Sequence, residues 1–304
     1  MTPEPKPQVL DALGACGRGE LAPNMALMRL IMASGSEADV EDALNTAMAV
    51  AEKAARHRLQ SALALWRQTP GAFTAVKSVL ASAHPSDSTV TGWKRAFDRA
   101  AGLSPEASVA LYSLGRRDVL EAATGEIVRH LKDWNVLPAG CRVLEVGCGI
   151  GRMVPPLAQE AEFVVGVDIS LAMLKEAIRN CPGNKSLLVQ GSGADLAPFR
   201  NEAFDLVLAI DSFPYIVAAG GDLAATHVAE AARVLRSGGA LVIVNYSYRG
   251  DDELDRRDLR ASAQAAALAM DLNGRRDFAL WDGLIFRLHK PGGVRNGSLR
   301  RRVP

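Results

Sequence analysis

The stretch VLEVGCGIGR, residues 143–152, decides the fold of this 304-residue chain. It opens with a short apolar run of the kind that forms a buried strand, and a helical pattern begins after it. Three glycines, Gly147, Gly149 and Gly151, separate the two parts. A Cβ atom at these positions would obstruct the turn or hold the backbone away from a ligand. The stretch therefore predicts a strand, a tight ligand-binding turn and a helix.

Short apolar runs alternate with helical stretches from residue 141 onward. Five runs indicate buried strands: CRVLEVG at 141–147, FVVGVD at 163–168, SLLVQG at 186–191, FDLVLAID at 204–211 and ALVIVNY at 240–246. This alternation is typical of βαβ units and of a parallel sheet with both faces covered. Residues 278–291 predict a final β-hairpin whose turn is Asp282-Gly283. We therefore expect an α/β fold with a doubly wound sheet.

The first third of the chain has a helical pattern. Residues 1–24 contain four prolines and three glycines and are expected to be loosely ordered, whereas residues 25–82 are rich in Ala, Leu and Met. Ser104 is suited to cap a helix that would stop at Gly115. We expect three parts: an all-helical region over 1–115, the sheet-containing domain over 116–291, and a basic, disordered tail over 292–304.

Composition and charge argue against several classes of protein. The chain has 35 basic and 34 acidic residues, so no global field favours nucleic acid or an anionic membrane. No segment approaches the roughly 20 apolar residues that span a bilayer, and the N-terminus does not resemble a signal peptide. The four cysteines have no metal-ligand spacing and are expected to be reduced. We therefore expect a soluble, cytoplasmic protein with no metal site and no membrane or nucleic-acid partner.

A second acidic residue supports a nucleotide-like ligand at the glycine turn. Asp168 ends the next predicted strand, where a carboxylate can accept hydrogen bonds from ribose hydroxyls, although it could instead cap the helix beginning near Ser170. The G-x-G-x-G spacing differs from the G-x-G-x-x-G of dinucleotide sites. Glu145, two residues before the first glycine, would repel a pyrophosphate. It would suit a ligand that carries an ammonium and a sulfonium, which is S-adenosylmethionine.

Residues 141–289 resemble the class I S-adenosylmethionine-dependent methyltransferases. VLEVGCGIGR is similar to their glycine-rich first motif, VVGVDIS to their acidic second strand, and FDLVLAIDSFPYI to their fourth-strand motif. EAARVLRSGGALVIVNY is similar to the helix and fifth strand that follow. The resemblance implies a mostly parallel seven-stranded sheet with a final antiparallel hairpin strand. It also implies S-adenosylmethionine as the cofactor and methyl transfer to an acceptor.

The same resemblance implies which residues contact the cofactor. They are Glu145, Gly147, Cys148, Gly149 and Gly151 around the methionine portion, Asp168 at the ribose, Ile169 on the adenine, and Asp211, Ser212 and Phe213 beside the methyl group. The third-strand loop, QGSGADL, should reach the adenine edge. Many relatives have an acid after the first glycine of this loop, and this chain has Ser192 there. Ser192, the Gly193 backbone or Asp195 could supply the contact.

The catalytic groups are left open by the sequence. Methyl transfer from a sulfonium is an in-line displacement, and alignment and exclusion of water can supply much of the catalysis. The segment DSFPY at 211–215 partly resembles the motif of enzymes that methylate planar nitrogens, so oxygen and nitrogen acceptors both remain open. Candidate catalytic residues are Tyr215, Tyr246 and His227, and candidate acceptor contacts are Tyr112, Tyr215, Tyr246 and Trp281. For Tyr246, His227, Tyr112 and Trp281 the alternative is simple packing.

Three functions fit these patterns. The leading hypothesis is a methyltransferase for a small molecule, in which the N-terminal helices form a lid, part of the acceptor pocket and a surface for homodimer formation. The second is a nicotinamide-dependent oxidoreductase, against which the glycine spacing and Glu145 argue. The third is a non-catalytic protein that binds S-adenosylmethionine and uses its N-terminal helices as an interaction surface.

Overall fold

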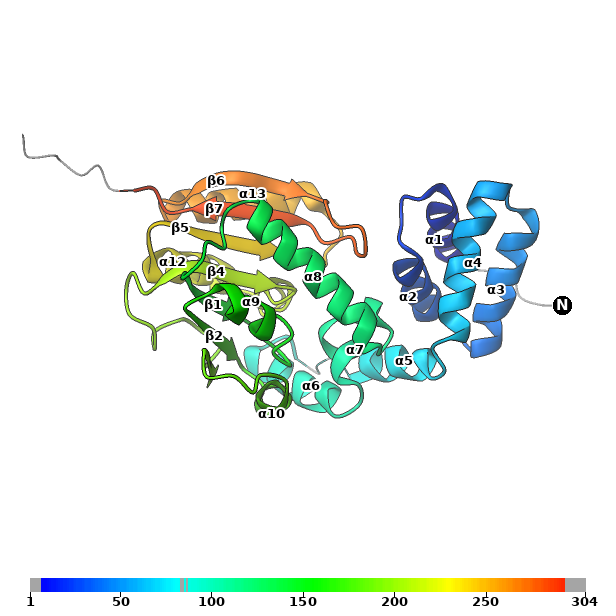
Figure 1. Cartoon of the computed structure of the whole chain (residues 1–304), viewed down its shortest axis with the longest axis horizontal. Helices are drawn as coiled ribbons and strands as arrows, with labels where there is room; N and C mark the ends of the chain where they lie inside the picture. Colours follow the sequence, from blue (N-terminus) through cyan, green and yellow to red (C-terminus); the bar gives the residue numbers. More distant parts are fainter. Residues whose placement is uncertain (1–6, 83–84, 86, 293–304) are drawn as a thin grey trace, which may run out of the picture.

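A helical region leads into a seven-stranded sheet in the computed structural model of this chain, which describes residues 7–82, 85 and 87–292 (Figure 1). The N-terminal region contains α1 (Pro7–Arg18), α2 (Pro23–Ala33), α3 (Glu37–Val50), α4 (Lys53–Arg67), α5 (Ala72–Ser82), α6 (Val90–Ala101), α7 (Pro105–Val109) and the 3₁₀ turn η1 (Leu111–Ser113). The sheet region contains α8 (Arg117–Asp133), α9 (Val154–Glu160), α10 (Leu171–Asn180), α11 (Phe213–Ala218), α12 (Leu223–Val234) and α13 (Asp252–Ala265). Its strands are β1 (Arg142–Val146), β2 (Phe163–Asp168), β3 (Ser186–Gln190), β4 (Phe204–Ile210), β5 (Leu235–Val244), β6 (Ala269–Arg275) and β7 (Ile285–His289).

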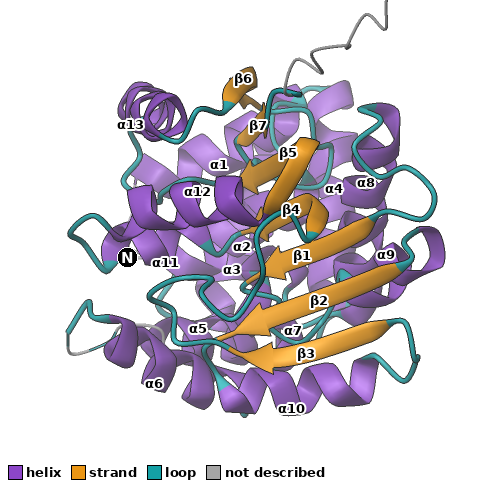
Figure 2. Cartoon of the chain, turned by 90° about the vertical axis from the view of Figure 1, so that its left-hand side faces the viewer, coloured by secondary structure: helices purple, strands orange, loops and turns teal. Residues whose placement is uncertain are grey.

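The strand order is β3-β2-β1-β4-β5-β7-β6, with the first five strands parallel and β7 antiparallel to both neighbours. The chain runs outward from β1 to β3 and then returns to β4 on the other side of β1 (Figure 2). Open α/β sheets bind ligands beside the carboxyl ends of the strands at such a reversal. The sheet predicted from the sequence is therefore confirmed, including its final antiparallel strands.

Successive side chains of each strand enter two different cores, as the pleat of a strand requires. Val143 and Leu206 pack in the core that includes residues of α8 and α9, whereas Leu144 and Val207 pack in the core that includes residues of α12 and α13. Figure 2 shows these two pairs of helices on opposite faces of the sheet. Glu145 follows Leu144 in β1, so the alternation directs its carboxyl toward the face covered by α8 and α9.

Helices α1 to α4 form a bundle with a core of its own, seen in blue beside the sheet in Figure 1. Helices α5 and α6 connect this bundle to the sheet region. The Asp98 carboxylate at the end of α6 accepts hydrogen bonds from Ser170 Oγ at 2.6 Å and from the Ala172 amide at 3.2 Å. These bonds fix α6 at the start of α10, next to the carboxyl end of β2. In the described ranges, no helix has both the length and the apolar character of a membrane span.

The helix predicted from Ser104 to Gly115 is broken. Ser104 caps its start as predicted, since its Oγ accepts a hydrogen bond from the Ala107 amide. The α-helix ends at Val109, because Ala110 is extended with φ −161°, and η1 follows. The break lets Val109 contact the glycine turn, where a Cβ at Gly149 would lie 2.7 Å from Val109 Cγ1. Packing against the sheet therefore overrides the local helical signal.

Two further expectations were wrong. Residues 1–24 are not all loosely ordered, because α1 begins at Pro7 and buries Leu13 and Cys16 in the core of the bundle. The final hairpin pairs β6 with β7, and Asp282-Gly283 lies in the loop between them. That loop buries Trp281, which explains why it is longer than a tight turn. The predicted tail at 292–304 lies, from residue 293 on, outside the described residues.

Glu126 of α8 anchors the loop between β6 and β7, so Glu126→Ala should destabilise the protein. The side chain is 5% exposed, and its two oxygens accept hydrogen bonds from the Ala279 amide at 2.6 Å and the Leu280 amide at 3.1 Å. Loss of both bonds should lower the free energy of unfolding by about 2–4 kcal/mol. Denaturant unfolding measures this loss. Glu121→Ala on the exposed side of α8 is the control, and an equal effect of both variants would contradict the anchoring role.

Candidate functional site

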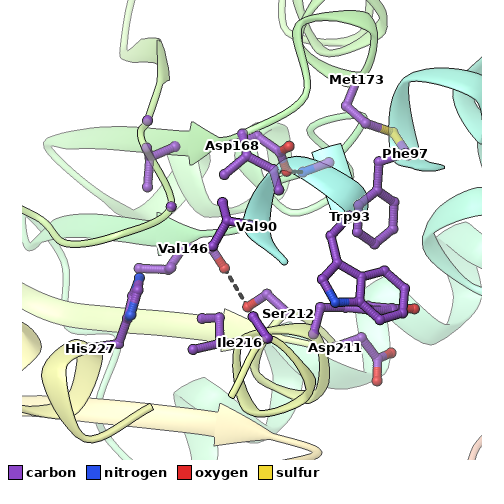
Figure 3. A pocket seen from close by; sticks show the side chains of 18 of the residues that line it. Val90, Trp93, Phe97, Val146, Asp168, Met173, Asp211, Ser212, Ile216 and His227 are labelled. Atoms are coloured by element: carbon purple, nitrogen blue, oxygen red, sulfur yellow. Dashed lines mark hydrogen bonds between the residues drawn. The ribbon is translucent and has the colours of Figure 1, made fainter. Parts of the chain in front are cut away.

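A pocket opens beside the carboxyl ends of β1, β2 and β4 (Figure 3). It contains about 940 Å³ of space between protein atoms, the solvent at its mouth included. Its walls come from α6, the turn after β1, the end of β2, the loop after β3, and helices α11 and α12. The pocket therefore lies at the reversal of strand order, where the sequence predicts ligand binding.

The glycine turn forms the floor of this pocket. Gly147, Gly149 and Gly151 have φ values of +75°, +53° and +74°, in the left-handed region that favours glycine. A Cβ at Gly147 would lie 2.4 Å from Ser212 Cβ, and one at Gly151 would lie 2.7 Å from Cys181 Sγ. The turn is thus closed to side chains by its neighbours, and Gly147 and Gly149 line the pocket directly.

Asp168 at the end of β2 holds the turn from the side. Its Oδ2 accepts a hydrogen bond from the Gly149 amide at 2.8 Å, and its Oδ1 accepts one from the Ser170 amide at 2.8 Å. Ser170 itself caps α10, because its Oγ accepts from the Met173 amide. Burial raises the pKa of Asp168 to about 6, although the hydrogen bonds from Ser170 and Gly149 oppose this rise. The carboxylate lines the pocket and keeps acceptor capacity for a ligand.

Asp211 and Asn245, which directly follow β4 and β5, are hydrogen-bonded to each other and have similar backbone conformations. Both have positive φ, +56° and +61°, which is uncommon for residues other than glycine. Asn245 Nδ2 donates to Asp211 Oδ1 at 2.6 Å, and the hydroxyl of Tyr248 donates to the same oxygen at 2.8 Å. Burial raises the pKa of Asp211, while the nearby Arg152 guanidinium lowers it. Asp211 therefore presents a fixed carboxyl to the pocket.

A buried group of polar side chains lies next to the turn. Arg152, which follows the last glycine, donates from Nη1 to the Tyr112 hydroxyl at 2.8 Å, and its Nη2 lies 4.0 Å from Asp211 Oδ2. Arg152 Nη2 and Glu145 Oε2 are both buried and have no hydrogen-bond partner within the described residues. Burial raises the pKa of Glu145 to about 8, and Arg152 opposes this rise. These two atoms are unsatisfied unless a ligand or solvent reaches them.

Aromatic residues of α6 form a wall that the sequence analysis missed. Trp93 and Phe97 line the pocket, and each packs edge-on against Tyr215 of α11, at centroid distances of 4.8 and 4.7 Å. Phe97 follows Trp93 by four residues, so both lie on one face of the helix. That spacing was present in the sequence, but it is equally typical of core packing.

The predicted site residues fall into two groups. The pocket is lined by Gly147, Gly149, Asp168, Ile169, Gly193, Asp195, Asp211, Ser212, Tyr215 and His227. The other predicted residues described here lie outside its lining: Glu145, Cys148, Gly151, Ser192, Phe213, Tyr112, Tyr246 and Trp281. Phe213 and Tyr246 pack on each other at 5.7 Å, and Tyr112 packs on Trp281 at 5.3 Å. Ser192 is exposed, and its Oγ accepts from the Ala194 amide.

No group of three or more His, Cys, Asp or Glu side chains within residues 7–82, 85 and 87–292 could hold a metal ion. Three acids, Asp168, Asp195 and Asp211, line the pocket instead, together with apolar and aromatic side chains. Such a lining suits an organic ligand with cationic character at one part and apolar surface at another.

Residues 144–243 match the family model described as a methyltransferase domain. A Talaromyces variabilis protein named as an S-adenosyl-L-methionine-dependent Diels-Alderase is 28% identical over 164 residues, or 51% of this chain and 54% of that protein. A 2-methyl-6-phytyl-1,4-hydroquinone methyltransferase of Synechocystis is 29% identical over a stretch that covers 42% of this chain and 40% of that protein's length. A demethylmenaquinone methyltransferase of Tropheryma whipplei is 34% identical over a stretch that covers 36% of this chain and 44% of that protein's length. The chain thus spans about half, or less, of the length of these relatives.

Tyr112 accepts the hydrogen bond from Nη1 of the buried Arg152, so Tyr112→Phe should destabilise the protein. The side chain of Arg152 is 7% exposed, and removal of the hydroxyl leaves its Nη1 without this partner. We expect a loss of about 1–3 kcal/mol in the free energy of unfolding, measured with denaturant. Tyr248→Phe removes a hydrogen bond to Asp211 Oδ1, but this oxygen keeps the bond from Asn245 and the tyrosine is 60% exposed, so the loss should be smaller than in Tyr112→Phe. Equal stability of Tyr112→Phe and the wild type would show that Arg152 does not depend on this bond.

Proposed function

We propose, from the premise that this chain carries a class I S-adenosylmethionine-dependent methyltransferase domain, that it methylates a small molecule at oxygen or nitrogen by in-line displacement. The observation that carries the proposal is the pocket at the reversal of strand order. In that pocket the glycine turn, Asp168 of β2 and Asp211 beyond β4 meet. Each of these elements belongs to a different strand end, and together they fit a nucleoside that carries a charged tail.

The glycine turn supports the cofactor assignment. A Cβ at Gly149 would collide with Val109 and one at Gly147 with Ser212, so only glycine lets the turn pack this closely while both residues line the pocket. Asp168 would hold the ribose, because its carboxylate lines the pocket beside the turn and can accept hydroxyl hydrogen bonds. Ile169 would pack on the adenine. The cradle therefore fits the nucleoside in the orientation expected from the sequence.

The unpaired buried atoms next to the turn support the same cofactor. Its methionine end carries an ammonium, a carboxylate and the sulfonium. Glu145 Oε2 and Arg152 Nη2 have no hydrogen-bond partner among the described residues. Arg152 would complement the carboxylate of that end, and Glu145, whose pKa is raised to about 8, would ionise beside the ammonium. A pyrophosphate would gain no ion pair from Glu145 and would raise the pKa of this carboxyl further, which argues against the nicotinamide-dependent oxidoreductase.

His227 supports a contact to the adenine base. Its Nδ1 lies 2.9 Å from the Leu223 carbonyl, which can only accept, so the neutral ring carries its lone pair on Nε2. Burial lowers the pKa of His227 and keeps the ring neutral. In Figure 3 His227 and Asp211 lie on opposite sides of the pocket, with Val146 between them. We therefore assign His227 to the amino group of adenine and remove it from the catalytic candidates.

The acceptor would occupy the side of the pocket formed by Asp211 and the aromatic rings of α6 and α11. Two of the relatives are named for quinone-type substrates, and an aromatic wall suits a planar ring of that kind. The chemistry the cofactor supplies when bound is an activated methyl group. The contribution of this chain is to align the acceptor with that group and to exclude water. Helix α6, which lines the pocket through Trp93 and Phe97, would serve as a lid and so give the N-terminal region this role.

The proposal is tested first by calorimetric titration with S-adenosylmethionine, S-adenosylhomocysteine and NAD. The first two should bind with micromolar affinity and NAD should not, because of Glu145. Asp168→Ala should lower the affinity at least tenfold, since it removes the ribose acceptor and the bond to Gly149. Binding of NAD alone would overturn the proposal. Because one relative is a Diels-Alderase by name, radiolabelled methyl transfer to cell-extract small molecules is the second readout, and binding without transfer would favour the non-catalytic alternative.

The assignment of His227 predicts a base-specific effect. His227→Ala should lower the affinity for S-adenosylhomocysteine about three- to tenfold, because one hydrogen bond is lost. The affinity for S-inosylhomocysteine should not change, because its base has a carbonyl at C6 in place of the amino group and this carbonyl cannot donate to His227. The ratio of the two affinities cancels any general effect on folding. Asp195→Asn, which alters the other candidate at this end, is the matched control. If Asp195→Asn, and not His227→Ala, loses the preference for S-adenosylhomocysteine over S-inosylhomocysteine, the base contact belongs to the loop after β3.

A further inference from the structure

Four aromatic rings gather at the Asp211 side of the pocket, and we call Trp93, Phe97, Tyr215 and Tyr248 the aromatic cluster. Trp93 and Phe97 pack on Tyr215, whose ring centroid lies 5.9 Å from that of Tyr248. The Tyr248 hydroxyl in turn donates to Asp211. Contacts therefore connect the indole on α6 to the carboxylate beyond β4. A planar ring can pack against such a cluster by offset or edge-to-face contact.

Trp93 carries an unsatisfied donor into this space. Its Nε1 is buried and has no hydrogen-bond partner within the described chain. Figure 3 shows the indole nitrogen on the side of the ring that faces Ser212 and Ile216, both of which line the pocket. A buried donor without a partner costs free energy, and most such groups in proteins are paired. We therefore expect the acceptor molecule to present an oxygen or another hydrogen-bond acceptor to Trp93.

Asp211, which also lines the pocket, has an oxygen that accepts no hydrogen bond from the described residues. Its Oδ1 is occupied by Asn245 and Tyr248, whereas the Oδ2 contact described by the structure is the Arg152 guanidinium at 4.0 Å. The positive φ of Asp211 is a strained backbone conformation, and strain of this kind clusters at functional sites. Asn245 has the same conformation, and its Nδ2 donates a hydrogen bond to Asp211 Oδ1. The orientation of the Asp211 carboxyl is therefore fixed by residues at the ends of both β4 and β5. Such rigidity is what a base needs for a proton transfer over hydrogen-bond distance.

We propose that the acceptor is a planar aromatic or enolic alcohol, held by the aromatic cluster, and that Asp211 Oδ2 is the general base for its hydroxyl. The inference rests on the proposed methyltransferase function. The hydroxyl oxygen attacks the methyl carbon, a C–O bond forms and the C–S bond breaks. The sulfur keeps the bonding electron pair and leaves as a neutral thioether. The hydroxyl proton passes to Asp211, which later releases it to solvent.

The charges of the pocket favour this class over two others. Asp168, Asp195 and Asp211 line it, while no Lys or Arg side chain does in the part of the chain that the structure describes. A carboxylate acceptor would therefore meet like charge, and the nearby cation, Arg152, lies outside the lining with its Nη2 4.0 Å from Asp211 Oδ2. An aromatic amine could donate to Asp211, but its delocalised nitrogen lone pair is a weak acceptor and would leave the Trp93 donor without a partner. The free donor of Trp93 and the free acceptor of Asp211 instead complement a hydroxylated ring.

The test measures methyl transfer from radiolabelled S-adenosylmethionine to 2-naphthol, 1,4-naphthohydroquinone and 4-hydroxycoumarin. The comparison compounds are 2-naphthylamine and 2-naphthoate, which carry an amine or a carboxylate in place of the hydroxyl of 2-naphthol. Products are identified by mass spectrometry. We expect O-methyl products from at least one alcohol and none from the comparison compounds. Transfer to the amine or the carboxylate alone, to ring carbon, or to none of the alcohols would overturn the acceptor class. Micromolar binding of S-adenosylhomocysteine, measured in parallel, separates that failure from failure of the methyltransferase proposal.

Two variants then examine the named side chains, using the alcohol that is methylated. Asp211→Asn should lower kcat at least 100-fold, while affinity for S-adenosylhomocysteine changes less than threefold. Trp93→Phe should raise KM for the alcohol about tenfold, with kcat within threefold of the wild type. Trp134→Phe, at the end of α8 and outside the pocket, is the matched control and should change neither. Asp211→Asn activity within tenfold of the wild type would rule out Asp211 as the base.

A pH profile of the wild type keeps the test decisive if Asp211→Asn fails to fold. Transfer to 2-naphthol should decline toward acid pH as Asp211 becomes protonated. Transfer to 2,4-dinitrophenol, which is already ionised above about pH 5, should not. The groups that face Asp211 are Arg152 after β1, Asn245 and Tyr248 after β5, Tyr215 of α11 and Asp282 of the last loop. Identical profiles for the two phenols would show that no base acts on the hydroxyl.

Discussion

The Gly149 amide and the Asp168 carboxylate share a hydrogen bond of 2.8 Å that joins the ends of β1 and β2, and the geometry of the whole pocket follows from it. The bond requires the backbone after β1 to turn back across the sheet within reach of β2. Such a path passes through positive φ at Gly147 and Gly149 and leaves no space for a Cβ at either residue. Ser212, which would meet a side chain at Gly147, can then close on the Val146 carbonyl from the end of β4. Three strand ends are thus drawn together by one turn.

The long N-terminal region has a physical role in this arrangement. Val109 packs on Gly149, and Asn24 of α2 donates from Nδ2 to the carbonyls of Tyr112 at 3.2 Å and Leu280 at 3.0 Å. Tyr112 then holds the buried Arg152. A chain of contacts therefore runs from the helical bundle to the charged group next to the pocket. We infer that the bundle contributes to the site by fixing this chain and by carrying α6 over the pocket.

The sheet and the cofactor end of the pocket could be predicted from the sequence, because their signals are local. The run from Val143 to Arg152 contains its own strand, turn and helix start, and Asp168 sits at a strand end that the apolar pattern defines. The acceptor side could not be predicted in the same way. Trp93 and Phe97 have the spacing of ordinary core residues, and only the docking of α6 onto α10 brings them to the pocket. The break after Val109 and the buried Trp281 have the same origin, since tertiary packing overrides local preference.

The carboxyl groups in and beside the pocket couple the charge of the cofactor to the order of events. Glu145, with a pKa raised to about 8, holds its proton at neutral pH, and a cation bound beside it favours loss of that proton. By linkage, affinity for a sulfonium should therefore rise with pH up to about 8, where the free protein has already lost the proton. Methyl transfer removes one positive charge and returns the carboxyls to their preference for the neutral form. Loss of that charge removes the attraction between the bound ligand and the ionised carboxyls, which favours release of the product.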